Sequence, residues 1–277
     1  MKLFAQLSLL TVCAMTATSC GEGIDLAAFE PTRVKGQFER TLSVNGPVDL
    51  SVRTGSGDIH VKVGADNQVR VVGRITSGNQ LFGDGAQERV RQVEAAPPIQ
   101  QAGNVIRIGD TNDDQRYRNI SISYELIVPA NTQMTSHTGS GDQVIGSLNG
   151  SVSARAGSGD IDVERAGGGL DARAGSGDVH AKAVGGAINV RVGSGDVDVA
   201  QTGKGDVDIQ AGSGDVTVVL PTDAAVTLTA RTGSGSIDTH HPVQVQGKRQ
   251  RNRLEGPVRG GGSRVDIKTG SGSIEIR

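Results

Sequence analysis

The tetrapeptide Gly-Ser-Gly-Asp recurs along the second half of the chain at nearly constant spacing. Five copies follow one another at intervals of 18, 18, 18 and 19 residues, beginning at Gly139, Gly157, Gly175, Gly193 and Gly212. A fixed period of this length is typical of a solenoid, in which each repeat packs its apolar side chains only against the neighbouring repeats. The coils of this chain must therefore stack.

Three further copies lie outside this regular train. One copy begins at Gly55, and two later copies begin at Gly233 and Gly270. The later two have Ser236 and Ser273 in place of the aspartate. The Gly270 copy, being last in the chain, is expected to close the stack, with the charged residues of its coil discouraging strand pairing at that end.

Each repeat also contains two short stretches in which apolar and polar residues alternate. In the repeat around Gly157, Val152, Ala154 and Ala156 precede the turn, and Ile161 and Val163 follow it. Such alternation is typical of half-buried β-strands. The sequence therefore predicts an all-β fold, a single β-solenoid whose coils of about 18 residues each carry two strands and two tight corners.

The equivalent apolar positions predict which residues meet between coils. Val152, Leu170, Ile188 and Val207 occupy the same place in four successive repeats and should be neighbours in the core. Regular coils are predicted over residues 137–240. Glycine suits the corners because it adopts positive φ without strain. The predicted turn residues are Gly55, Gly57, Asp58, Gly139, Gly141, Asp142, Gly157, Gly159, Asp160, Gly175, Gly177, Asp178, Gly193, Gly195, Asp196, Gly212, Gly214 and Asp215.

A column of basic residues accompanies these turns. Two positions before a Gly-Ser-Gly turn stand Arg53, Arg155, Arg173, Arg191 and Arg231, with His137, Gln210 and Lys268 at the equivalent place in other copies. Stacking would place like charges about 4.8 Å apart, which is repulsive unless they are neutralised. The turn aspartates could neutralise this charge ladder across the corner, or each could accept N–H bonds within its own turn while the arginines are solvated.

The composition limits the functions open to the chain. It holds 41 glycines, has 2% aromatic residues and carries a formal charge of −2. The strict period and the β-branched alternation argue against glycine-rich disorder. No basic excess indicates nucleic-acid binding. No nucleophile elbow, phosphate loop or cysteine–histidine zinc pattern is present, so no enzyme activity, cofactor or metal is predicted. A calcium β-roll is disfavoured because alternate half-turns lack the required aspartate.

The N-terminus reads as an export signal. Residues 1–20 combine one charge, Lys2, with a short apolar run that ends in Ala17-Thr18-Ser19-Cys20. This run is too short to span a membrane. The segment resembles a lipobox, in which the Cys20 thiol is acylated, although the usual leucine is Ala17 here. The expected location is the outer membrane, facing the periplasm or the cell surface, and the alternative is a secreted or periplasmic soluble protein.

The remaining chain divides into a tether over 21–36 and a solenoid domain over 37–277. Insertions of about 76–104, 109–119 and 241–262 are predicted to be loops that interrupt the coils. Gln87–Glu94 could form a helical turn or two, but a loop on the flank of the solenoid is preferred.

Two segments carry a family resemblance. Tyr124–Pro129, followed by the train of Gly-Ser-Gly-Asp turns, and the ending Arg264–Arg277 resemble the DUF4097 family of adhesin-like proteins. The related head GIN domains share the same turns, and the similarity extends over roughly residues 37–277. The resemblance implies a β-solenoid in a bacterial cell-envelope protein and offers no catalytic residues.

The predicted function is accordingly a non-enzymatic, adhesin-like interaction scaffold of the cell envelope. Its expected partners are an envelope protein or a surface glycan, with membrane attachment through a lipid anchor if Cys20 is acylated. The alternatives are an envelope-stress or signalling accessory lipoprotein and, less favoured, a polysaccharide-active enzyme built on a β-helix.

Overall fold

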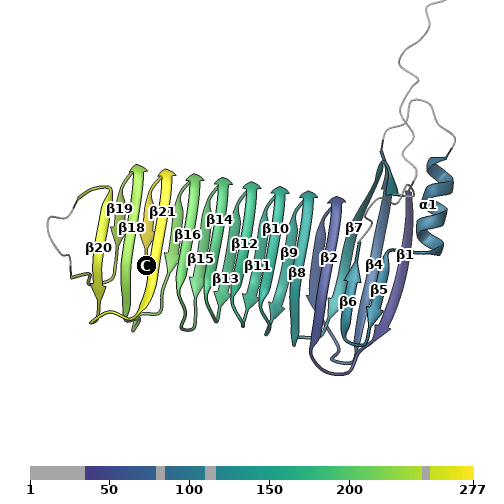
Figure 1. Cartoon of the computed structure of the whole chain (residues 1–277), viewed down its shortest axis with the longest axis horizontal. Helices are drawn as coiled ribbons and strands as arrows, with labels where there is room; N and C mark the ends of the chain where they lie inside the picture. The colour runs from purple at the N-terminus through teal and green to yellow at the C-terminus, as the bar shows by residue number, and fades with distance from the viewer. Residues whose placement is uncertain (1–34, 79–84, 110–116, 245–249) are drawn as a thin grey trace, which may run out of the picture.

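The computed structural model describes residues 35–78, 85–109, 117–244 and 250–277. The predicted signal peptide, the lipidation site Cys20 and nearly all of the predicted tether lie outside the described residues. Within them the chain forms two sheets, each of eleven strands, and one helix, α1 (Ala86–Ala95). The two sheets face each other along the row of coils in Figure 1. The predicted all-β solenoid is confirmed.

Sheet A contains the strands that follow the Gly-Ser-Gly corners, together with an antiparallel extension. Its strands are, in spatial order, β1 (Lys35–Ser43), β4 (Gln68–Ser77), β7 (Ile120–Val128), β3 (Ile59–Val63), β9 (Gln143–Leu148), β11 (Ile161–Ala166), β13 (Val179–Val184), β15 (Val197–Gln201), β17 (Val216–Val219), β22 (Ile274–Ile276) and β19 (Ile237–Thr239).

Sheet B contains the strands that enter those corners. Its strands are, in spatial order, β20 (Arg253–Val258), β18 (Val226–Ser234), β21 (Ser263–Ser271), β16 (Val207–Ser213), β14 (Ile188–Ser194), β12 (Leu170–Ser176), β10 (Val152–Ser158), β8 (Thr132–Ser140), β2 (Val48–Ser56), β6 (Val105–Ile108) and β5 (Ile99–Ala102). All neighbouring strands in the middle of both sheets are parallel.

The stacking of equivalent residues follows the predicted register. Val152 pairs with Leu170, Leu170 with Ile188, and Ile188 with Val207. All four side chains are at most 3% exposed. The core between the sheets is narrow, so small and β-branched side chains fill it without large aromatic groups. The prediction that these four residues line up is confirmed.

The N-terminal end is closed by antiparallel strands and the helix. Strands β1, β4 and β7 extend sheet A, and Phe38 meets the buried Tyr124 edge to face, with ring centroids 6.4 Å apart. Burial raises the pKa of the Tyr124 phenol. Helix α1 packs against β1 and β4 through Val90 and Val93, which are at most 2% exposed. This arrangement covers a strand edge that would otherwise be open to pairing.

The predicted loop over 76–104 is therefore wrong in its main part. It contains α1 and β5, and Gln87–Glu94 forms most of the helix. The apolar signal was weak because only Val90 and Val93 of this segment face the core. The predicted loop over 241–262 is also wrong in part, since β20 pairs antiparallel with β18 there.

The order of coils in space differs from their order in the chain at both ends. At the N-terminal end, β2 lies between β6 and β8, so the coil formed first is enclosed by a later one. At the other end, β21 lies between β16 and β18, and β22 lies between β17 and β19. The C-terminus consequently lies one coil inside the row (Figure 1).

The last repeat therefore does not close the stack, contrary to the prediction from its place in the sequence. The terminal coil is β18–β19, covered on one side by β20. The charged residues that were expected to discourage strand pairing at this end, Lys268, Glu275 and Arg277, belong to the enclosed coil β21–β22. They therefore do not lie at the end of the stack.

Candidate functional site: the outer face of sheet B

The turn aspartates connect each coil to the next. The backbone N–H of Asp160 donates to Oδ1 of Asp142 at 3.0 Å, and that of Asp178 donates to Oδ1 of Asp160 at 2.8 Å. The same contact recurs along the column, from Asp142 to Asp58, Asp196 to Asp178, Asp215 to Asp196, and Ser273 to Asp215. Each aspartate thus caps the turn of the following coil. From the sequence it was expected to accept N–H bonds within its own turn.

The arginine column runs along the outer face of sheet B at one register position. The pairings between strands define nine positions in spatial order, here called the basic ladder: Arg53, His137, Arg155, Arg173, Arg191, Gln210, Lys268, Arg231 and Arg253. All nine side chains are exposed. The structure therefore brings together the five predicted ladder arginines and adds Arg253, which lies in a segment predicted to be a loop.

The charge on the ladder is offset by a neighbouring column and not by the turn aspartates. Asp171 lies 3.8 Å from Arg155 and 3.6 Å from Arg173, and Glu255 lies 2.8 Å from Arg253. Among the described residues no ion pair joins a ladder arginine to a turn aspartate. The hypothesis that the two predicted columns neutralise each other is therefore wrong. The turn carboxylates are already committed to backbone N–H groups.

The neighbouring column is only partly acidic. Its nine positions are, in spatial order, Ser51, Thr135, Ser153, Asp171, Asn189, Asp208, Asp266, Thr229 and Glu255. Arg53 lies beside Ser51 and Arg191 beside Asn189, and neither arginine makes an ion pair with another described residue. Where the residue beside a ladder arginine is neutral, the arginine's charge is not neutralised within the protein and can bind a partner. The sequence signal for the acidic column was the Asp-x-Arg spacing of Asp171 and Arg173.

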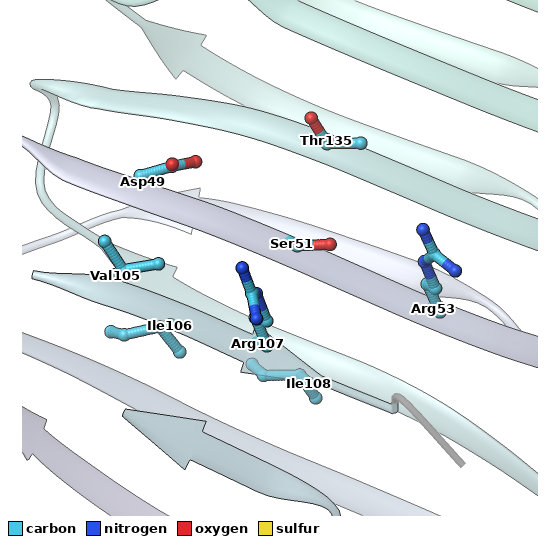
Figure 2. Close-up of a pocket in the computed structure, with 8 residues that line it drawn as sticks. All are labelled: Asp49, Ser51, Arg53, Val105, Ile106, Arg107, Ile108 and Thr135. Carbon is cyan, nitrogen blue, oxygen red and sulfur yellow. The ribbon is translucent and has the colours of Figure 1, made fainter. Parts of the chain in front are cut away.

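Figure 2 shows the N-terminal end of this face, where Arg53 projects from β2 and Arg107 from the adjacent β6. Asp49, Ser51 and Thr135 lie on the same face, and together these residues line a depression of ≈ 340 Å³. Arg107 is exposed and, within the described part of the chain, has no ion pair. It adds a cation that the repeat pattern did not reveal, because β6 has no Gly-Ser-Gly turn.

A shallow groove of ≈ 660 Å³ follows the middle of the ladder, and we call it the arginine groove. One side is formed by His137, Arg155, Arg173, Arg191 and Gln210, and its other lining residues are Ala156, Gly157, Ala174, Gly175, Val192, Gly193, Ala211 and Gly212. The glycines have no side chains, so the surface beside the arginines stays low. The repeat thus produces a long, straight surface with cations along one side.

Other chemistry is not evident in the described residues. No group of three or more His, Cys, Asp or Glu there could hold a metal ion. No helix among the described elements has the length and apolar character needed to cross a membrane. His241 is partly buried, and its Nε2 has no hydrogen-bond partner within the part of the chain that the structure describes. The basic ladder and its groove are therefore the candidate site.

Two exposed carboxylates paired with cations should make the free energy of unfolding fall modestly at acid pH. Lys62 and Arg74 hold the pKa of Glu125 below its ordinary value of 4.5, and Arg253 and Arg231 do the same for Glu255. Because these folded-state pKa values are lowered, the two groups contribute stability above pH 4.5 that is lost as the pH falls below it. The double variant Glu125→Gln/Glu255→Gln should weaken the acid dependence of the free energy of unfolding, measured by urea denaturation at each pH.

The effect should be small and should shrink at high salt, because all of the charges are exposed. Parallel pH profiles for the variant and the unmodified protein at low salt would contradict this assignment.

The fold and this face define the class of protein: a two-sheet β-solenoid with a basic column along one outer face. Within this class, residues 170–277 match the family model described as Toastrack DUF4097. The resemblance inferred from the sequence is confirmed for this part of the chain, which includes the enclosed C-terminal coil.

Among the solved structures with a related arrangement are two from different bacteria. One is titled "a putative cell adhesion protein" from Clostridium sporogenes ATCC 15579, with 17% identity, a TM-score of 0.39, and coverage of 88% of this chain and 99% of that one. The other is titled "a putative adhesin" from Bacteroides fragilis NCTC 9343, with 12% identity, a TM-score of 0.33, and coverage of 87% and 97%. A search of curated proteins gave no match. At these similarities, neither structure indicates what this chain binds.

Proposed function

We propose that the protein is a non-enzymatic, exported scaffold of the bacterial envelope that binds its partner through the outer face of sheet B. The basic ladder carries this proposal. Seven of its nine positions are arginine or lysine, and all nine are exposed in one straight column. A column of like charges is unfavourable for stability on its own. Its presence along the whole stack supports a role in contacting something outside the molecule.

The proposed mechanism is multivalent contact by a rigid surface. Parallel strands hold successive ladder side chains about 4.8 Å apart, so a partner can engage several of them at once. Each contact at an exposed charge is weak, but linked contacts act together and raise the overall affinity. The partner would be an envelope protein or a surface glycan, and acylation at Cys20 would hold the scaffold at the outer membrane.

A charge-removal experiment tests which face binds. The triple variant Arg155→Gln/Arg173→Gln/Arg191→Gln removes three central ladder charges. We expect its binding to isolated bacterial envelopes, measured by co-sedimentation of the labelled protein, to fall by about tenfold or more, equivalent to about 1.4 kcal/mol. Folding should be retained, because these side chains are exposed and their pairs are worth little.

The matched control removes three cations from the outer face of sheet A: Lys62→Gln/Lys182→Gln/Arg277→Gln. These residues lie on β3, β13 and next to β22. Both variants change the net charge equally, so they separate a binding face from a general charge effect. Equal losses of binding in the two variants, or no loss in the ladder variant, would refute the proposal.

A further inference from the structure

The arginine groove has a geometry that selects for an extended ligand. Its ladder side comprises five successive positions, from His137 on β8 to Gln210 on β16. The stacking distance sets the spacing of these positions at about 4.8 Å. A ligand that uses all of them must be linear, must lie along the solenoid axis and must repeat at a similar distance.

The charges on this side favour an anionic ligand. Arg191 has no ion pair among the described residues, and one carboxylate, Asp171, faces both Arg155 and Arg173. The two distances, 3.8 and 3.6 Å, are long for charge-assisted hydrogen bonds, so these guanidinium groups keep N–H donors free. Along the five groove positions, three arginines stand against two carboxylates of the neighbouring column, Asp171 and Asp208, so a positive surplus remains.

The other side of the groove suits a flat, hydroxyl-rich polymer. Gly157, Gly175 and Gly193 leave a low surface beside the arginines. Beyond them Ser158, Ser176 and Ser194 stack in register, and all three are exposed. A sugar ring can lie against the glycine surface with its carboxylate toward an arginine and its hydroxyl groups toward a serine.

The same features disfavour the other common polyanions. Single-stranded nucleic acid is usually held by stacking of its bases on large aromatic side chains, and no described Phe, Tyr or Trp lines the groove. A lipid surface would contact the whole face, including the carboxylates of the neighbouring column.

We propose that the arginine groove binds a linear acidic polysaccharide with one carboxylate on each sugar, lying along the solenoid axis. This inference rests on the proposed function and names its ligand. Guanidinium groups of Arg155, Arg173 and Arg191 bind those carboxylates that face the ladder, while His137 and Gln210 offer hydrogen bonds at the two ends.

The test uses oligogalacturonates of increasing length as probes, with binding to the full-length protein measured by calorimetry. Affinity should rise with length and level off at about five to six sugars, when the oligomer spans the five groove positions. The fully methyl-esterified oligomer of the same length has no charge and should bind at least about tenfold more weakly. Arg173→Gln should lower the affinity by about tenfold, whereas Arg173→Lys should lose less, because it keeps the charge.

Several outcomes would overturn this inference. They are equal binding of the methyl ester, no effect of Arg173→Gln, no plateau with length, or equal or tighter binding of single-stranded DNA or of vesicles rich in anionic phospholipid. If the ladder triple variant loses envelope binding while no oligogalacturonate binds, the acidic polysaccharide is excluded and the binding face stands. If the envelope assay also shows no dependence on the ladder, both proposals fail.

Discussion

Replacing Gly175 by alanine should destabilise the protein by about 3 kcal/mol or more, the upper range for forcing extra atoms into a packed site. A Cβ at this position would lie 2.5 Å from the carbonyl oxygen of Gly157 in the adjacent coil. That oxygen belongs to backbone held between two stacked strands, so it cannot move aside without opening the stack. Equilibrium denaturation in urea would measure the change in the free energy of unfolding.

Gly55 offers a matched control within the same chain. It holds the equivalent position in its own Gly-Ser-Gly-Asp turn and belongs to the same column, since the Gly139 position abuts the Gly55 carbonyl. Among the described residues, a Cβ on Gly55 would meet nothing within 4 Å, because β6 ends before reaching this level. Gly55→Ala should therefore change stability by less than about 1 kcal/mol and could stabilise by restricting the unfolded chain. Equal destabilisation by both variants would place the requirement in the local turn and not in stacking.

The repeat made the stacking of the middle coils predictable because one constraint recurs at every coil. The position of Gly175 requires the absence of a side chain, and the alternation around it assigns Ala174 to the core and Arg173 to the surface. These two local features fix both the face and the register of each strand. The register then determines the ladder, so five of its arginines could be read from sequence.

The order of the end coils could not be predicted because every coil presents nearly the same edge. The Gly212 and Gly233 turns are 21 residues apart, close to the regular interval, yet the strands that carry them are separated by β21. Only one local feature marks the difference: Ser236 and Ser273 replace aspartate where the column of aspartate caps ends at Asp215. The helix was missed for a different reason, because only three residues, Ala86, Val90 and Val93, form its buried side.

The parts of the candidate site that sequence reasoning missed depend on long-range pairing. Arg253 joins the ladder through antiparallel pairing of β20 with β18, and Asp171 lies beside Arg155 only because β10 and β12 are neighbours. Neither relation has a fixed spacing in the chain. The partial neutralisation of the ladder, and hence the free charge of Arg191, could be found only from the structure.

Removing residues 259–277 deletes β21 and β22 and should also unfold the neighbouring strands β18 and β19. Strands β21 and β22 supply the buried side chains Val265, Ile267, Ile274 and Ile276, each worth about 1.5–3 kcal/mol of burial and together about 6–12 kcal/mol. They also provide every parallel pairing of β18 and β19. We expect amide hydrogen exchange in peptides from Val226–Ser234 and Ile237–Thr239 to lose its protection, while peptides from β10 to β13 keep theirs, because a solenoid coil depends on its direct neighbours.

The truncation distinguishes an enclosed C-terminal coil from a terminal one. If β21–β22 were the last coil of the stack, their removal would expose only the surface of the preceding coil, and β18–β19 would stay protected. After truncation β18 keeps its antiparallel partner β20 but can regain a parallel partner only by moving a full strand spacing, about 4.8 Å, onto β16. In the intact protein the connection from Leu220 to Ala225 crosses over the inserted coil, and its contacts with Gly262 and Arg277 are lost with the truncation. Retained protection of β18 and β19 would show that this shift occurs, and that the inserted coil is not required to hold the end of the solenoid.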